Sequence, residues 1–125
     1  MIFVADLTLV WLTIRALRGA GTALIFDRYA YDALVQLRHQ EACGEGFFRR
    51  WSRLIPRPDL AFLLRTGPEV AHKRRPEYTI EECASKAGLY TLMAERIGFC
   101  VVDAENEKRA REEVRGILAY AERNW

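Results

Sequence analysis

The sequence predicts a three-layer α/β fold, in which helices cover both faces of a parallel β-sheet. Three short apolar runs, at residues 23–26, 60–64 and 99–102, contain no polar residue. Unbroken apolar runs of this length are typical of strands that are buried on both faces, as in a parallel sheet. Helical patterns alternate with the three runs, and this order favours parallel strands joined by right-handed crossovers.

The first half of the chain has three helical patterns around the first apolar run. Residues 2–18 are mostly apolar, and this pattern ends at Gly19 and Gly21, because glycine is a common stop at the end of a helix. Residues 29–39 predict a second helix. Residues 47–54 predict a third, which is short, basic and aromatic.

The second half of the chain has three more helical patterns. Pro68 stands at a typical first helical position, so a helix is expected to run to Arg74. Thr79 and Glu82 have the spacing of a capping box, which predicts a helix that begins there and ends at Gly98. The last helix follows Asp103, and its apolar residues share one stripe: Ala110, Val114, Ile117, Leu118 and Ala121.

Length and composition indicate one globular domain over residues 1–125, with 50% hydrophobic and 29% charged residues. The net charge of +2 is too small to indicate a nucleic-acid partner. The apolar stretch at the amino end is interrupted by Asp6 and Arg15, so it predicts neither a membrane span nor a membrane partner. Three cysteines without a CxxC spacing favour a reducing compartment, and we expect a cytoplasmic protein.

The charge is unevenly distributed along the chain. Residues 49–75 contain eight basic and two acidic residues, a net charge of +6, whereas the rest contains eleven basic and fifteen acidic residues, a net charge of −4. One interpretation is that the basic segment holds an anionic ligand at one place. The other is that it forms a solvated basic face, as most charged runs do.

Polar residues follow each of the three predicted strands, at the sheet edge where open parallel sheets bind ligands. Asp27 and Arg28 follow the first strand, residues 65–69 the second, and Asp103 with Ala104 the third. An aspartate at this edge can bind a hydrated magnesium ion, and the neighbouring arginine can bind a phosphate through two hydrogen bonds. Alternatively, Asp27 caps the next helix and Arg28 only balances its charge.

These segments, taken in order, resemble thymidylate kinase-like P-loop nucleotide kinases. The resemblance runs from about residue 9 to the carboxyl end. It rests on Phe26-Asp27-Arg28-Tyr29, on Arg57-Pro58-Asp59-Leu60, on Gly67-Pro68-Glu69-Val70-Ala71 followed by Lys73-Arg74-Arg75, and on Val102-Asp103-Ala104. It implies a P-loop kinase-like fold, ATP and Mg²⁺ as cofactors, and transfer of the γ-phosphoryl group of ATP to a nucleoside monophosphate (thymidylate-like) or a related acceptor.

The resemblance also implies a role for each matching residue. Arg28 would bind the acceptor and the transferring phosphate, Asp27 would support the metal ion, and a lid would close over the ATP phosphates. The implied catalytic residues are Asp27, Arg28, Arg74 and Arg75, with Asp27 as the metal-site residue. The implied acceptor contacts are Arg28, Tyr29, Tyr31 and Asp32, and the implied ATP contacts are Arg74, Arg75, Asp103 and Ala104.

Two departures from the family limit what carries over. The chain contains no GxxxxGK(S/T) phosphate loop, and the Gly19–Gly21 pair lacks a lysine, so we expect an amino-terminally truncated domain without the strand that carries this loop. The helix after Tyr29 lacks the serine of thymidylate kinases, so thymidine specificity does not carry over. We therefore expect a nucleotide-biosynthesis kinase in the full-length form. The alternatives are a non-catalytic nucleotide-binding or scaffolding remnant, or a fragment that works only if a partner supplies the missing strand and loop. Exposed strand edges also favour association, so a homo-oligomer is a possible partner state.

Overall fold

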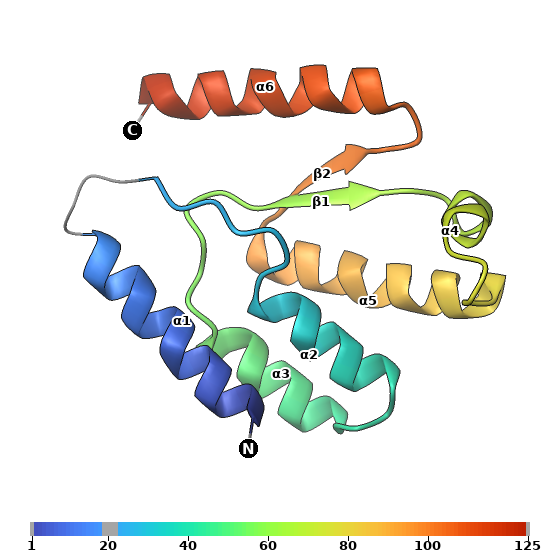
Figure 1. Cartoon of the computed structure of the whole chain (residues 1–125), viewed down its shortest axis with the longest axis horizontal. Helices are drawn as coiled ribbons and strands as arrows, with labels where there is room; N and C mark the ends of the chain where they lie inside the picture. The colour runs from blue at the N-terminus through green and yellow to red at the C-terminus, as the bar shows by residue number, and fades with distance from the viewer. Residues whose placement is uncertain (1, 19–22, 125) are drawn as a thin grey trace. The chain divides into compact units, whose positions relative to one another are not determined.

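The computed structural model describes the backbone of residues 2–18 and 23–124, and the side chains of residues 7–17 and 23–124. The chain divides into two compact units, Met1–Arg57 and Pro58–Trp125. The described residues form three helices in unit 1, and three helices and two strands in unit 2 (Figure 1): α1 (Ile2–Arg18), α2 (Ala30–His39), α3 (Glu45–Leu54), β1 (Phe62–Arg65), α4 (Pro68–Arg74), α5 (Ile80–Ile97), β2 (Cys100–Asp103) and α6 (Glu107–Asn124).

The predicted three-layer parallel sheet, and with it the sheet of a P-loop kinase-like fold, is wrong. Helices dominate, and the described residues form a single sheet of two short strands. The expected strand at residues 23–26 is not formed, and its Ile25 side chain is 95% exposed. An apolar run becomes a strand only where a neighbouring backbone pairs with it, and in the described part of the chain only β1 and β2 are paired.

The other two predicted strands are confirmed, each displaced by one or two residues. β1 and β2 run parallel, with Phe62 opposite Cys100 and Arg65 opposite Asp103. The connection between them passes through α4 and α5, as a parallel pair requires. Helices α5 and α6 lie on opposite sides of the two strands (Figure 1), and Val102 of β2 is fully buried.

The core of unit 1 lies between α2 and α3. Leu34 and Val35 of α2 are almost fully buried, as are Phe48 of α3 and Ile55 just after it. A hydrogen bond ties the start of α2 to the chain that leaves α3, because the Tyr29 hydroxyl donates to the Pro56 carbonyl oxygen at 2.9 Å.

The helix signals at both ends of α5 are confirmed. Thr79 Oγ1 accepts a hydrogen bond from the Glu82 N–H at 3.1 Å, and the Thr79 N–H donates to Glu82 Oε2 at 2.7 Å. This reciprocal pair is the capping box. Gly98 ends the helix with φ 84°, a left-handed conformation that glycine adopts without steric cost.

Among the residues that the structure describes, none of the helices combines the length and the apolar character needed to cross a bilayer.

Candidate functional site

The candidate site lies in unit 2, where the chain leaves the carboxyl ends of β1 and β2. Two hydrogen bonds fix the loops there: the Gly67 N–H donates to Glu105 Oε1 at 3.1 Å, and the Glu105 N–H donates to Asp103 Oδ1 at 2.9 Å. A Cβ atom at Gly67 would lie only 2.9 Å from Glu105 Oε1. A side chain at position 67 would therefore displace the exposed Glu105 carboxylate from the Gly67 N–H.

An arginine of α4 reaches the loop after β2. Arg74 Nη2 donates to the carbonyl oxygen of Ala104 at 3.4 Å, a contact between residues 30 positions apart. The resemblance implies that Arg74 contacts the ATP phosphates from the lid and that Ala104 lies near the adenine. The structure brings these two side by side within one unit.

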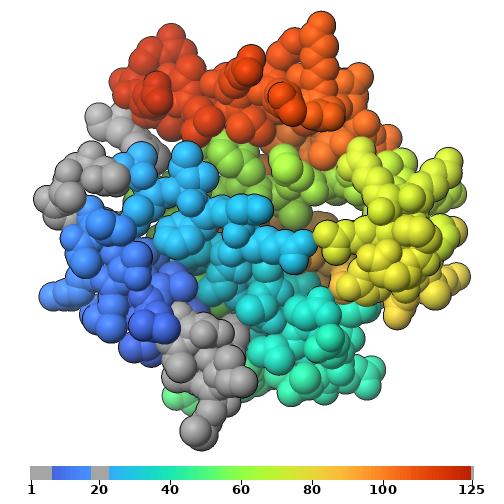
Figure 2. All heavy atoms as spheres, in the orientation of Figure 1, coloured from blue at the N-terminus to red at the C-terminus, as the bar shows by residue number. Residues whose placement is uncertain are grey.

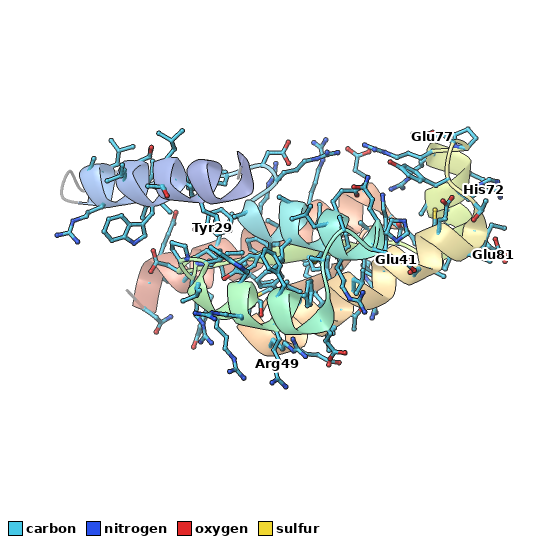
Figure 3. All side chains as sticks on the ribbon, turned by 90° about the horizontal axis from the view of Figure 1, so that it is seen from below. Tyr29, Glu41, Arg49, His72, Glu77 and Glu81 are labelled. Carbon is cyan, nitrogen blue, oxygen red and sulfur yellow. The ribbon has the colours of Figure 1, made fainter. Side chains whose placement is uncertain are left out.

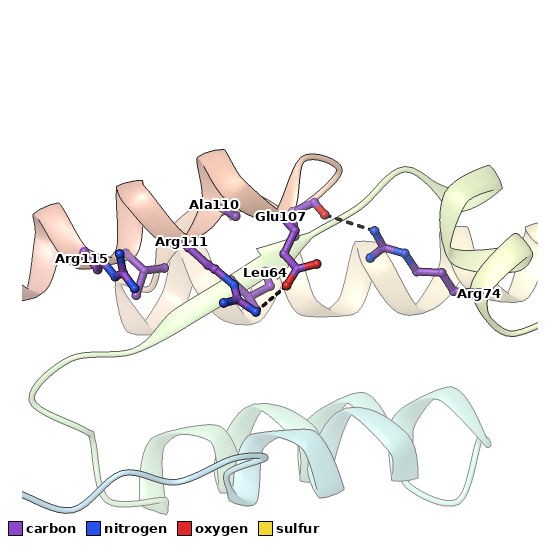
Figure 4. A pocket seen from close by; sticks show the side chains of 8 residues that line it. Leu64, Arg74, Glu107, Ala110, Arg111 and Arg115 are labelled. Carbon is purple, nitrogen blue, oxygen red and sulfur yellow. Dashed lines mark hydrogen bonds and ion pairs between the residues drawn. The ribbon is translucent and has the colours of Figure 1, made fainter.

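Arg74 and Ala104 open onto a shallow groove of about 710 Å³ between β1 and α6 (Figure 4). Figure 2 shows α6, on one side of this groove, as a continuous ridge at the surface. The groove is lined by Leu64, Arg74, Ala104, Glu107, Ala110, Arg111, Val114 and Arg115. Three of these residues are cationic and one is acidic, so the lining carries a net charge of +2.

The lining combines an apolar floor with a cationic rim. Leu64, Ala110 and Val114 supply the apolar surface, and Leu64 is 59% exposed, so its side chain is accessible to a ligand. Glu107 forms an i,i+4 ion pair with Arg111, which holds that guanidinium beside the groove (Figure 4). Such a surface suits a flat apolar ring joined to an anionic group, because guanidinium binds phosphate oxygens through paired hydrogen bonds.

The other residues expected to contact ATP have different positions. Arg75 is the C-cap residue of α4. Its side chain is exposed and does not line the groove. Asp103 uses one carboxylate oxygen to accept the Glu105 N–H, so it shapes the loop.

Sequence reasoning missed Leu64, Glu105, Arg111 and Arg115. A signal was present for the last two, because Arg111 and Arg115 are spaced i,i+4 directly beside the apolar stripe of α6.

The residues expected to bind the acceptor belong to unit 1, at the start of α2. The ring centroid of Tyr29 lies 5.3 Å from that of Phe26 and 5.4 Å from that of Tyr31. Tyr31 is only 3% exposed, so its ring packs in the core of unit 1. Burial, reinforced by Tyr29, raises the pKa of Tyr31 to about 12, although the nearby Arg57 opposes the shift.

Asp27 and Arg28 are exposed, and Arg28 adopts a left-handed backbone conformation with φ 60°. This conformation costs a non-glycine residue about 1–2 kcal/mol. Glu41, for which no role is expected, adopts the same conformation with φ 56°. The role that the resemblance implies for Arg28 stays a prediction.

The eight basic residues between positions 49 and 75 are divided equally between the two units. Arg49, Arg50, Arg53 and Arg57 belong to unit 1, and Arg65, Lys73, Arg74 and Arg75 belong to unit 2. Of these eight, Arg74 lines the groove. The basic segment at residues 49–75 therefore contributes one cationic side chain to the groove.

The residues present fit the implied cofactors in part. Among the described residues, no group of three or more His, Cys, Asp or Glu side chains could hold a metal ion. Asp27 offers a single carboxylate, which fits Mg²⁺ only as one ligand beside phosphate oxygens and water. The groove offers apolar side chains beside three arginines. The sequence has no glycine-rich loop with a lysine for the β- and γ-phosphates.

Comparisons of the sequence with protein-family models and curated proteins, and of the fold with solved structures, found no significant match.

Proposed function

We propose that unit 2 binds a nucleotide, or another ligand that joins a planar ring to a phosphate, in the groove between β1 and α6. The observation that carries the proposal is the contact of Arg74 with Ala104 at the end of a groove with an apolar floor. The ring would pack on Leu64 and Val114, and the phosphate would lie at Arg74 and Arg115.

We further propose that this binding serves a nucleotide kinase-like protein, whose full-length form transfers a phosphoryl group from ATP to a nucleoside monophosphate or a related acceptor. This step rests on the order of the four motifs in the sequence. In phosphoryl transfer the protein mainly positions the reactants and stabilises the charge of the transferring group, so exposed arginines are the side chains that such a site needs. Arg28 and Arg74 are both exposed.

The second candidate is a non-catalytic nucleotide-binding or scaffolding protein. One observation favours it: this sequence contains no GxxxxGK(S/T) motif. In this alternative the groove binds the nucleotide in the same way, and no phosphoryl group is transferred.

The proposal is tested by the binding of ADP that carries a fluorescent N-methylanthraniloyl group. We expect weak binding that decreases between 50 and 200 mM NaCl, because salt screens exposed charges over about 8–10 Å. Arg74→Gln should weaken binding about tenfold, equivalent to about 1.4 kcal/mol. The matched control is Arg123→Gln, an exposed arginine of α6 outside the groove, which should bind as the parent chain does. Equal binding by the parent chain and Arg74→Gln would refute the site.

A further inference from the structure

A second surface, in unit 1, also combines apolar and basic side chains. Helix α3 buries Phe48 and Ser52 against the core of its unit. A second apolar stripe runs beside this buried face, with Phe47, Trp51 and Leu54 at i, i+4 and i+7. Phe47 is 40% exposed and Leu54 is 60% exposed, so the core of unit 1 covers this stripe only in part.

Arginines follow the apolar stripe on its far side. Arg49, Arg50 and Arg53 are exposed, and Glu45 is the one acidic residue of α3. At about 100° per residue, Arg50 lies about 40° around the helix from Leu54, and Arg53 and Arg49 follow further round. Figure 3 shows Arg49 on the outer side of α3. We call the surface formed by Phe47, Trp51, Leu54, Arg50 and Arg53 the α3 face.

We propose that the α3 face binds an acidic amphipathic helix of a partner protein. The spacing of Phe47, Trp51 and Leu54, four residues and then three, is the spacing of a helix–helix seam. A partner helix on this seam would cover the exposed Leu54 with its own apolar stripe. Its carboxylates, spaced i,i+3 or i,i+4, would lie opposite Arg50 and Arg53, which bind carboxylates through paired hydrogen bonds.

Two features favour a protein helix over the other anionic partners. The Phe47 and Trp51 rings pack against each other, with centroids 5.6 Å apart and planes 38° apart, so each ring covers part of the other and leaves less ring face for stacked bases. The arginines border the apolar stripe on one side only, and the buried face of α3 borders it on the other. A helix that lies on a bilayer has polar residues directed to water on both sides of its apolar stripe. In α3, one side of the stripe is instead the face that packs into the core of unit 1.

The test uses the whole chain and a fluorescent 18-residue synthetic peptide. The peptide carries leucines at i, i+4 and i+7 and glutamates at the flanking positions, and a scrambled peptide of the same composition is the control. We expect saturable binding to the first peptide that weakens with salt. Arg50→Gln with Arg53→Gln should weaken it about tenfold, and Leu54→Gln about fivefold, because each change removes one kind of contact from the α3 face.

The matched control is Arg96→Gln, an exposed arginine of α5 in the other unit, which should bind the peptide like the parent chain. Circular dichroism of each variant verifies that the helices are kept. Equal affinity for the scrambled peptide, or no effect of the α3 variants, would overturn the proposal. Stronger binding to phosphatidylserine vesicles or to oligouridine than to the acidic peptide would also overturn it.

Discussion

The guanidinium of Arg74 donates a hydrogen bond to the carbonyl oxygen of Ala104, with Nη2 3.4 Å from the oxygen. This bond joins the end of α4 to the loop after β2, two segments that the sequence separates by the whole of α5. A second link, from the Gly67 N–H to Glu105, fixes the same two loops. Both links are exposed, and together they connect the loop after β1 and the end of α4 to the loop after β2.

Thr79→Ala should destabilise the chain by about 1 kcal/mol, because it removes the acceptor for the Glu82 N–H at the start of α5. The free energy of unfolding in urea measures the effect. Ser85→Ala, at an exposed position inside the same helix, is the control and should leave stability equal or slightly higher. A loss of the same size in both variants would contradict the capping role.

Arg28→Gly should keep or raise the stability of unit 1 and, at the same time, weaken ligand binding. Glycine adopts the φ of 60° without strain, so thermal unfolding should show stability that is equal or higher by up to about 1 kcal/mol. The same change removes a cation that we expect to bind phosphate, so the affinity for the acceptor nucleotide should fall. Glu41→Gly is the matched control, since Glu41 has φ 56°: it should gain the same stability and keep its affinity. An unchanged affinity for the acceptor nucleoside monophosphate in Arg28→Gly would exclude Arg28 from the acceptor site.

Tyr31 should make the chain sensitive to alkaline pH. Its pKa is about 12 in the folded chain against 10.0 for the free side chain, so the folded state holds this proton more tightly. The resulting stabilisation is fully present below pH 10 and is lost as the pH rises through about 12. The stability of Tyr31→Phe relative to the parent should therefore rise by on the order of 2 kcal/mol over this window. Tyr120→Phe, at a residue that is 66% exposed, should show no such change, and equal pH profiles for all three proteins would refute this account.

The chain should transfer no phosphoryl group by itself. The sequence has no loop of backbone N–H groups and lysine to hold the β- and γ-phosphates, and exposed arginines do not replace it. An assay with radiolabelled ATP, magnesium and each nucleoside monophosphate should give the rate of the control without protein. Turnover that requires magnesium and is lost in Arg28→Ala would contradict this prediction.

Local signals in the sequence were sufficient to predict the helices and two of the three expected strands. The capping box at Thr79 and the stop at Gly98 depend on neighbouring residues alone, and both are confirmed. The apolar run at 23–26 has the same local character as the run at 99–102, yet only the latter pairs with another strand. The two runs differ in whether the backbone of another strand lies beside them, and the apolar character of a run does not determine this.

The candidate site was predictable to a smaller extent. Motif order pointed to Arg74 and Ala104, which the structure brings together. It did not indicate Arg111 or Arg115, because their place beside the groove depends on how α6 packs against the strands. It also assigned Tyr31 to the acceptor, whereas the fold buries this ring. Burial results from tertiary packing, and the residue type alone does not determine it.

The most direct test of the nucleotide site is a ¹H–¹⁵N correlation spectrum of the chain, recorded during a titration with ADP. The account predicts that the largest shifts occur at the backbone amides around the groove, those of Ala104, Glu105, Ala110 and Val114, and that they vanish in Arg74→Gln. They should be unchanged in Arg123→Gln. Saturating ADP that leaves these amides unshifted, or that shifts only amides of unit 1, would contradict the account.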